Sequence, residues 1–290
     1  MICSVYGDKI KMKTLYLSDL DGTLLNNDAL LSEKTVGILN RLLSENVYFT
    51  VATARTYATV IPIFEKVDLR YPLVLMNGVC IYDPVGRKTL VSHSIDTETG
   101  HKILDVYASF GISPMLYFEE DSHITVEYRM LYNQAQSDYI HSRRNFFNKN
   151  FVKVDEFSLS DKTNLIYSVY LDSREKVEPI YHKLLSIQGI CCSFYPDNYT
   201  GFYFLEVYAA GVSKLSGAMQ VKNMLGCDKI VAFGDNMNDL PLLENADEGY
   251  AVGNASEEVK KRAYAVIGKN DEDAVAVFLE KRKNDGHINL

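Results

Sequence analysis

The stretch LYLSDLDGT, residues 15–23, joins a short apolar run to an acidic turn. An uninterrupted apolar run of this length is typical of a strand that is buried on both faces of a parallel sheet. Asp19 and Asp21 lie two residues apart, so their side chains point the same way if the strand stays extended. Two like charges on one side are costly unless a cation lies between them. The pair therefore suits a hard divalent ion such as Mg²⁺, although an acidic turn without a ligand is an alternative.

Strands and helices alternate on both sides of this stretch. Ser32 is an expected helix N-cap, because apolar residues at helical spacing follow it. The alternation returns near the C-terminus, where the strand KIVAF, residues 229–233, precedes Gly234 and Asp235. Strand, helix, strand at this pitch indicates a parallel sheet with right-handed crossovers. The expected strands cover residues 15–20, 48–53, 73–76, 229–233, 250–252 and 264–267, and the expected helices cover residues 32–46, 213–225, 240–245, 256–262 and 271–283.

The segment from residue 86 to residue 207 has a different character. Alternating strands and amphipathic helices favour an α+β unit there, and 11 of the 20 tyrosines fall between Tyr117 and Tyr208. We therefore expect an α/β protein with a Rossmann-like parallel-sheet core and an inserted α+β domain. The core would consist of residues 1–85 and 208–290, and the insert of residues 86–207.

A second acidic segment, GDNMND at residues 234–239, also follows an apolar strand. Open α/β sheets bind ligands at the carboxyl ends of their strands, so these acids are expected on the same rim as the first pair. The alternative is a turn that caps the helix from Leu240. Thr53 ends a strand and Lys214 begins a helix, and singly they need no role beyond packing and solvation. Together, the four segments supply the nucleophile, metal site, hydroxyl and positive charge of a phosphoryl transfer.

Composition excludes several other classes of protein. The 38 acidic and 30 basic residues give a net charge of −8, which disfavours binding to nucleic acid or to an anionic membrane. The five cysteines form no C-x-x-C pair, and they are expected to be reduced. No window holds the ~20 apolar residues of a membrane span, and residues 1–13 lack the apolar core of a signal peptide. A cytoplasmic protein is expected, as a monomer or weak homodimer.

One basic cluster departs from this acidic balance. Arg143, Arg144, Lys149 and Lys153 lie among aromatic residues, namely Phe146, Phe147 and Phe151. Such a mixture can bind single-stranded nucleic acid. At helical spacing it is more often a solvated helix face over a packed aromatic stripe, and this is the interpretation that we favour.

The chain contains four segments in a fixed order, LSDLDGTLL (17–25), VATAR (51–55), GVSKLSGAM (211–219) and GDNMNDLPLL (234–243). They resemble, in this order, motifs I to IV of the haloacid dehalogenase (HAD) superfamily of phosphohydrolases. The long insert between the second and third is similar to the C2 cap of the Cof-type (type IIB) sugar phosphatases. The likeness covers the core, whereas in the cap it is topological only. It implies a HAD fold and a Mg²⁺-dependent phosphatase that acts on a small phosphorylated metabolite, with a sugar phosphate as the expected class. Two shorter segments, NG (77–78) and AVGNA (251–255), also match the subfamily.

The resemblance assigns the chemistry to carboxylates. Asp19 would attack phosphorus and form an aspartyl-phosphate, which splits one hard displacement into two easier steps. Asp21 would protonate the leaving oxygen and then deprotonate the water that hydrolyses the intermediate. The carboxylates of Asp19 and Asp235 and the backbone carbonyl of Asp21 would bind Mg²⁺. Asp239 would orient Lys214 or a water on the metal.

The resemblance also assigns the groups that hold the phosphoryl oxygens. These are the N–H of Leu20, the hydroxyl of Thr53, the N–H of Ala54, and the side chains of Lys214 and Asn238, which together form an electrostatic clamp. The second motif of the family usually reads Thr-Gly-Arg, and Ala54 stands in place of its glycine. The extra methyl group would crowd the phosphate or demand a negative φ, so reduced activity is expected.

Two alternatives keep the same core. A phosphomutase would return the phosphoryl group to a sugar hydroxyl, and it would form an isomeric sugar phosphate instead of inorganic phosphate. A catalytically weakened phosphate-binding protein would keep only the clamp. The presence of Asp19 and Asp21 together with Lys214 and Asp235 disfavours the second alternative.

Overall fold

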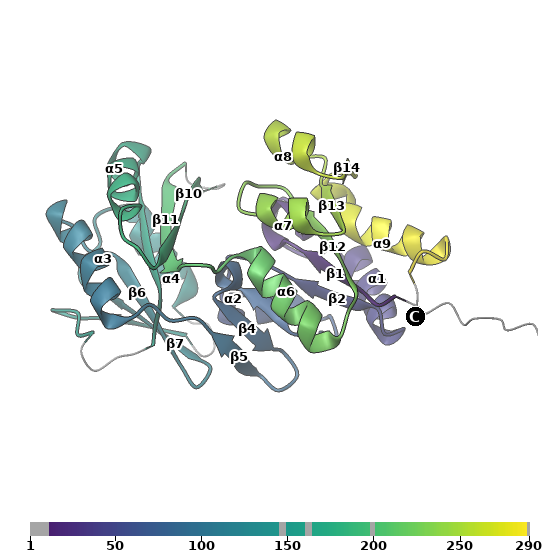
Figure 1. The fold of residues 1–290 in the computed structure, drawn as a ribbon, viewed down its shortest axis with the longest axis horizontal. Helices are drawn as coiled ribbons and strands as arrows, with labels where there is room; N and C mark the ends of the chain where they lie inside the picture. The colour runs from purple at the N-terminus through teal and green to yellow at the C-terminus, as the bar shows by residue number, and fades with distance from the viewer. Residues whose placement is uncertain (1–11, 145–148, 160–163, 198–200, 289–290) are drawn as a thin grey trace, which may run out of the picture. The chain divides into compact units, whose positions relative to one another are not determined.

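The computed structural model describes residues 12–144, 149–159, 164–197 and 201–288 (Figure 1). The chain forms two compact units. The described parts of Met1–Val51, Lys66–Tyr71 and Ala218–Leu290 make up the first, and those of Ala52–Glu65 and Pro72–Gly217 make up the second. We call them unit 1 and unit 2.

Unit 1 is built on a five-stranded sheet in which every pairing is parallel. Leu15, Leu17 and Phe233 are fully buried, as expected for strands that are covered on both faces. The predicted parallel-sheet core is therefore confirmed. The strand expected at residues 73–76 is not part of this sheet, because Leu73–Leu75 pair antiparallel with the following strand in a separate sheet. In spatial order the strands are β14 (Ala265–Val266), β13 (Glu248–Ala251), β12 (Lys229–Gly234), β1 (Thr14–Ser18) and β2 (Tyr48–Val51).

Two helices of unit 1, α1 and α9, contact each other, and hydrogen bonds connect the residues at their N-terminal ends. The hydroxyl of Ser32 caps α1 and accepts the N–H of Thr35 at 3.0 Å. The helix expected over residues 271–283 is broken at Asp273, whose φ is 59°, and whose carboxylate accepts the hydroxyls of Ser32 and Thr35. The helical elements are α1 (Glu33–Ser44), α7 (Leu240–Asn245), α8 (Glu257–Arg262), α9 (Ala274–Asn284), η1 (Leu20–Leu24) and η4 (Asn270–Glu272), and α6 (Lys214–Leu225) runs from unit 2 into unit 1.

Unit 2 contains a six-stranded sheet that is antiparallel except for the pair β7 and β8. Leu116, Leu205 and Val207 pack with the helices α3 and α5 on one face, and alternation places Tyr117 and Glu206 on the other. This is the α+β architecture expected of the insert. In spatial order the strands are β10 (Ile190–Pro196), β11 (Tyr203–Ala209), β9 (Leu165–Asp172), β6 (Met115–Glu120), β7 (His123–Tyr128) and β8 (Lys149–Lys153), and the helices are α3 (Thr97–Ser109), α4 (Gln134–Arg143) and α5 (Arg174–Leu184).

A smaller antiparallel sheet in unit 2 contains an unusual turn. Met76, Asn77 and Gly78 follow one another with φ values of 50°, 55° and 97°. Left-handed conformations are costly for residues other than glycine and persist only where the surroundings enforce them. The elements here are β3 (Leu73–Leu75), η3 (Met76–Gly78), β4 (Cys80–Asp83), β5 (Lys88–Ser92), α2 (Tyr57–Val60) and η2 (Ile61–Phe64).

The helical interpretation of the basic cluster is wrong beyond Arg143. Helix α4 ends there, and Lys149–Lys153 form strand β8 beside β7. Lys149 is only 2% exposed, and its ammonium lies 4.9 Å from the ring centroid of Tyr117 and 5.2 Å from that of Phe151. Burial, with the nearby Arg143, lowers the pKa of Lys149 to about 7. Lys149 is therefore part of a packed interior, whereas Phe146 and Phe147 lie outside the described residues.

The expected domain boundaries, after residues 85 and 207, do not coincide with the division into units. Residues 72–85 and 208–217 belong to the same compact unit as the six-stranded sheet. Compactness and the point of insertion are different criteria, so the boundaries stay a prediction. Within the described residues, no helix has the length and apolar character needed to cross a bilayer.

Candidate active site

Each of two neighbouring strands of unit 1 is followed directly by an aspartate. β1 and β12 pair in parallel with Ser18 opposite Phe233, and the N–H of Asp19 donates to the carbonyl of Phe233 at 2.9 Å. Asp19 directly follows β1, and Asp235 directly follows β12. Because parallel strands end at the same edge of a sheet, both carboxylates lie on one rim, which is where open α/β sheets bind ligands.

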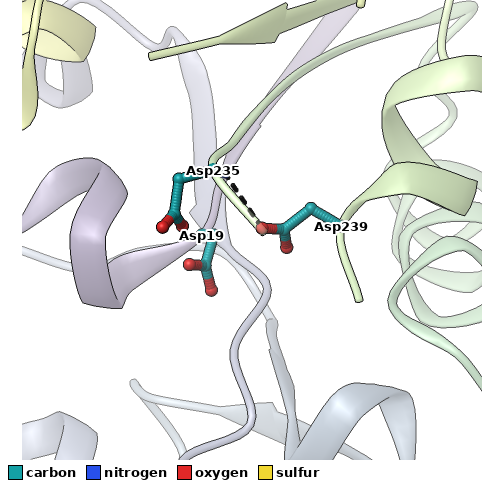
Figure 2. Close-up of side chains that lie close together, drawn as sticks. All are labelled: Asp19, Asp235 and Asp239. Carbon is teal, nitrogen blue, oxygen red and sulfur yellow. Dashed lines mark hydrogen bonds between the residues drawn. The ribbon is translucent and has the colours of Figure 1, made fainter. Parts of the chain in front are cut away.

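Three carboxylates converge at this rim, as Figure 2 shows. One oxygen from each of Asp19, Asp235 and Asp239 lies within 4.8 Å of the others. Asp19 is 6% exposed and Asp239 is 0% exposed. Charges this close and this poorly solvated repel one another unless a cation neutralises them. An all-oxygen set of donors suits Mg²⁺ better than Zn²⁺, so the residues present fit the metal that the family resemblance implies.

The turn after Asp21 is shaped around Asp235. Gly22 has a φ of 78°, and a Cβ atom built on it would lie 2.5 Å from Oδ2 of Asp235. The hydroxyl of Thr23 donates to Oδ1 of Asp235 at 2.9 Å. Glycine is therefore required at position 22 both for its backbone conformation and for space, and Thr23 fixes the orientation of the carboxylate that follows β12.

The side chain of Asp239 accepts backbone hydrogen bonds from its own loop, residues 234–239, and so fixes the conformation of that loop. Its Oδ2 accepts the backbone N–H of Asp235 at 3.1 Å and that of Asn236 at 3.0 Å (the former is dashed in Figure 2). Gly234 makes room for it, because a Cβ atom there would lie 2.6 Å from the Cβ of Asp239. The Asp239 carboxylate therefore holds the backbone at Asp235, in addition to facing the other two carboxylates.

Two asparagines, the exposed Asn254 and the buried Asn270, support the first acidic loop. The amide of Asn254 donates to the carbonyl of Gly22 at 2.7 Å and accepts the N–H of Asn270 at 3.0 Å. Asn270 in turn donates to the carbonyl of Leu25 at 2.9 Å. Sequence reasoning assigned no role to Asn254 or Thr23, although both fall in segments that the resemblance covers. Thr23 bonds to Asp235, 212 positions away, and Asn254 bonds to Gly22, 232 positions away. Contacts this distant leave no local pattern in the sequence, so only the fold reveals them.

The remaining predicted residues of unit 1 lie around this rim. Leu20 is fully buried, and Asp21 lies within η1 in an extended conformation, with φ −72° and ψ 119°. Asn238 and Asp21 are partly exposed. The backbone at Leu20 and Asp21 thus belongs to the same short loop as Asp19.

Three predicted phosphate-binding residues belong to unit 2. Thr53 is 1% exposed, and its hydroxyl accepts the N–H of Arg55 at 3.2 Å. Ala54 is partly exposed and is not among the described residues with a positive φ, so its methyl group causes no backbone strain. Lys214 is 2% exposed and is the first residue of α6. The approach of these groups to the carboxylates stays a prediction.

The chain is similar to curated phosphatases over nearly its whole length. It is 27% identical over 267 residues to the 5-amino-6-(5-phospho-D-ribitylamino)uracil phosphatase YitU of Bacillus subtilis (strain 168), covering 91% of this chain and 95% of that protein. It is 25% identical to the pyridoxal phosphate phosphatase YbhA of Escherichia coli (strain K12), over 90% of this chain and 95% of that protein.

Solved structures share the fold. A haloacid dehalogenase-like hydrolase from Bacteroides thetaiotaomicron superposes with a TM-score of 0.75 at 22% identity, covering 93% of this chain and 99% of that one. A HAD subclass IIB sugar phosphatase superposes with a TM-score of 0.70 at 23% identity, covering 94% and 99%. The predicted HAD fold is therefore confirmed.

The family model of the haloacid dehalogenase-like hydrolases matches residues 16–279. The match begins in β1, includes both acidic loops and ends in α9, so it spans the whole rim described above. This chain therefore belongs to the haloacid dehalogenase-like hydrolase family, and the prediction that it is a hydrolytic enzyme is confirmed.

Proposed function

We propose that this hydrolase is a Mg²⁺-dependent phosphatase that removes the phosphoryl group of a small metabolite, with a sugar phosphate as the expected substrate class, through an aspartyl-phosphate. The observation that carries the proposal is the convergence of Asp19, Asp235 and Asp239 within 4.8 Å at the end of β1 and β12. Membership of the hydrolase family and the similarity to curated phosphatases support it.

Three aspartates of unit 1 would each have a separate role in catalysis. Asp19, held by its N–H on Phe233, would act as the nucleophile that forms the phosphoenzyme. Asp21 would give a proton to the leaving oxygen and later take one from the attacking water. Asp235 would keep its orientation through Thr23 and the Asp239-bound backbone. When bound by Asp19, Asp235 and the Asp21 carbonyl, Mg²⁺ supplies positive charge that lets the carboxylate approach an anionic phosphate.

Thr53, Ala54 and Lys214 of unit 2 would hold the phosphoryl oxygens, together with Leu20 and Asn238. Hydrogen-bond donors and a positive charge aimed at these oxygens stabilise the charge of the transition state. Catalysis in this proposal is therefore mostly positioning and electrostatics, and Asp19 and Asp21 are the side chains that would form the covalent bond and transfer the protons.

The test is phosphate release from p-nitrophenyl phosphate and from a panel of metabolites, with and without Mg²⁺. The panel includes sugar phosphates, pyridoxal phosphate and a phosphoribityl compound, because the related proteins are named for such substrates. We expect turnover that requires Mg²⁺. Formation of an isomeric sugar phosphate without phosphate release would instead identify a phosphomutase. Phosphate binding without turnover would identify a weakened phosphate-binding protein.

Asp19→Asn tests the nucleophile. The substitution keeps the size of the side chain but removes its nucleophilic charge, so we expect turnover to fall by at least about 10³-fold with the fold intact. The matched control is Asp28→Asn, an exposed acid of the same segment, which should keep full activity. Mass spectrometry of acid-quenched wild type should find the added phosphoryl group on Asp19. Substantial turnover by Asp19→Asn would contradict the proposal.

A cytoplasmic location and a monomeric or weakly dimeric state stay predictions.

A further inference from the structure

Glu206 of β11 is a buried carboxylate that has no part in the steps above. It is 6% exposed. Its Oε2 accepts the hydroxyl of Tyr167 at 2.8 Å and the side-chain amide of Asn77 at 3.1 Å. The Asn77 amide also donates to the Tyr167 hydroxyl at 2.9 Å. The three side chains form a closed triangle, which ties strands β9 and β11 to the turn after β3.

The turn that carries Asn77 lies directly against the start of α6. A Cβ atom on Gly78 would lie 2.2 Å from the carbonyl oxygen of Ser213, and one on Gly217 would lie 3.2 Å from the Cα of Gly78. The two segments are therefore in backbone contact. Lys214 follows Ser213 immediately, and its charge is close enough to Glu206 to favour the ionised form of that carboxyl.

The same turn is bonded to the segment that presents Thr53 and Ala54. The N–H of Asn77 donates to the carbonyl of Thr53 at 2.9 Å, and the N–H of Thr53 donates to the carbonyl of Val74 at 3.0 Å. Asn77 has a left-handed conformation, with φ 55°, which its surroundings must enforce. Glu206 therefore anchors the side chain of a residue that lies between the Thr53 segment and the Lys214 helix.

We propose that Glu206 is a positioning residue of the phosphate site. It fixes Asn77, and through this turn it holds Thr53 and Lys214 in place, while its own negative charge competes with the phosphoryl group for Lys214. The inference rests on the proposed function, in which Thr53 and Lys214 hold phosphoryl oxygens. It adds to that function a carboxylate that sets the affinity for phosphate.

Protonation of Glu206 gives the proposal a measurable consequence. Burial raises the pKa of Glu206 to about 7, against the opposing effects of hydrogen bonds from Tyr167, Tyr195 and Asn77 and the charge of Lys214. At pH 6 the neutral acid of Glu206 no longer attracts Lys214, whereas at pH 8 the carboxylate of Glu206 competes with the phosphoryl group for this charge. The charge of Glu206 also contributes to raising the pKa of three other tyrosines, Tyr117, Tyr139 and Tyr208.

The experiment measures the Kd of inorganic phosphate by calorimetry on the full chain with Mg²⁺, at pH 6 and pH 8. Glu206→Ala removes the acceptor of the hydrogen bonds from Tyr167, Tyr195 and Asn77, and we expect its Kd to rise at least about tenfold at both pH values. Glu206→Gln keeps the shape without the charge. Its Kd should match the wild type within twofold at pH 6 and be about threefold lower than the wild type at pH 8. The second ionisation of phosphate affects both proteins equally, so it cancels in this ratio.

The matched control is Glu119→Gln, which alters another buried glutamate of the same sheet, 9% exposed and bonded to the N–H of Ser122. Its Kd should equal that of the wild type at both pH values. The inference is overturned if Glu206→Ala binds phosphate within twofold of the wild type, or if the ratio of wild type to Glu206→Gln is the same at pH 6 and pH 8. If Glu206→Ala does not fold, the second criterion decides alone.

Hydrolysis assays on the same proteins separate this inference from the proposed function. If the wild type hydrolyses phosphate esters and Glu206→Ala binds phosphate as tightly as the wild type, the inference is overturned. The proposed function would still hold in that case. A wild type that neither hydrolyses p-nitrophenyl phosphate nor binds phosphate would overturn both.

Discussion

Among single residues, the site depends on two glycines, because a larger side chain at either position would clash with an aspartate of the acidic loops. Gly22 combines a φ of 78° with a virtual Cβ atom 2.5 Å from the Asp235 carboxylate. Gly234 makes the corresponding space for Asp239. Both glycines therefore leave the space that these carboxylates occupy, and substitutions can test whether activity depends on it.

We predict that Gly22→Ala lowers turnover by more than tenfold and raises the Mg²⁺ concentration needed for half-maximal activity. The methyl group would displace the Asp235 side chain, whereas the positive φ alone costs roughly 1 kcal/mol of folding free energy. The control is Gly226→Ala, where φ is 61° and nothing lies within 4 Å of the new atom. Equal activity of the two variants would show that only backbone strain matters.

Ala54 allows a second test at this scale. Since its φ is not positive, the backbone tolerates alanine, and only crowding of the phosphate by the methyl group remains as a cost. Ala54→Gly should therefore raise kcat/KM for p-nitrophenyl phosphate several-fold. A fall in kcat/KM would contradict the idea of crowding and would indicate that alanine helps to hold the loop.

At the scale of elements, β11 carries a carboxylate whose protonation changes the stability of its sheet. The pKa of Glu206 is raised to about 7 from the ordinary 4.5, so between these pH values the folded state binds the proton more tightly than the unfolded chain does. The free energy of unfolding should fall as pH rises through this window, by at most about 3 kcal/mol. Glu206→Gln cannot titrate, so its stability relative to the wild type should increase from pH 5 to pH 8, as measured by urea unfolding. A constant difference would contradict the raised pKa.

Local patterns located most elements but not their interruptions. The apolar run of residues 15–20 and the Ser32 cap became β1 and α1. The helix from residue 271 was expected to be continuous, because the break at Asp273 depends on hydroxyls of Ser32 and Thr35 more than 230 positions away. The basic cluster was assigned to a helix from its spacing, whereas Lys149 pairs across to Ile124 in a strand. Tertiary contacts override local preference in both cases.

At the scale of the whole molecule, the predicted site residues are divided between the two units. Asp19, Asp21, Asp235 and Asp239 belong to unit 1, and Thr53 and Lys214 belong to unit 2. Motif order in the sequence predicted the convergence of the acidic loops, since parallel strands share a rim. The sequence did not predict Glu206, because its partners Asn77 and Tyr167 are 129 and 39 positions away and no local pattern marks a buried carboxylate.

This division predicts where a metal ion should stabilise the chain. We expect Mg²⁺ to slow amide hydrogen exchange around residues 15–24 and 233–240 of unit 1, because a ligand stabilises the folded state that binds it. Exchange in β9 and β11 should not change. Asp19→Asn should lose the protection, since one of the carboxylate ligands is gone. Protection that appears first in the six-stranded sheet would place the ion elsewhere.

The hydrogen-bonded triangle of Asn77, Tyr167 and Glu206 also bears on the design of chimeras between related enzymes. Splicing at residues 86 and 207 would take Tyr167 and Glu206 from one parent and Asn77 from the other, which leaves a buried acid facing an unmatched turn. Junctions at residues 72 and 217 would transplant all three side chains together with Lys214. A swap of substrate preference is best attempted with these wider junctions.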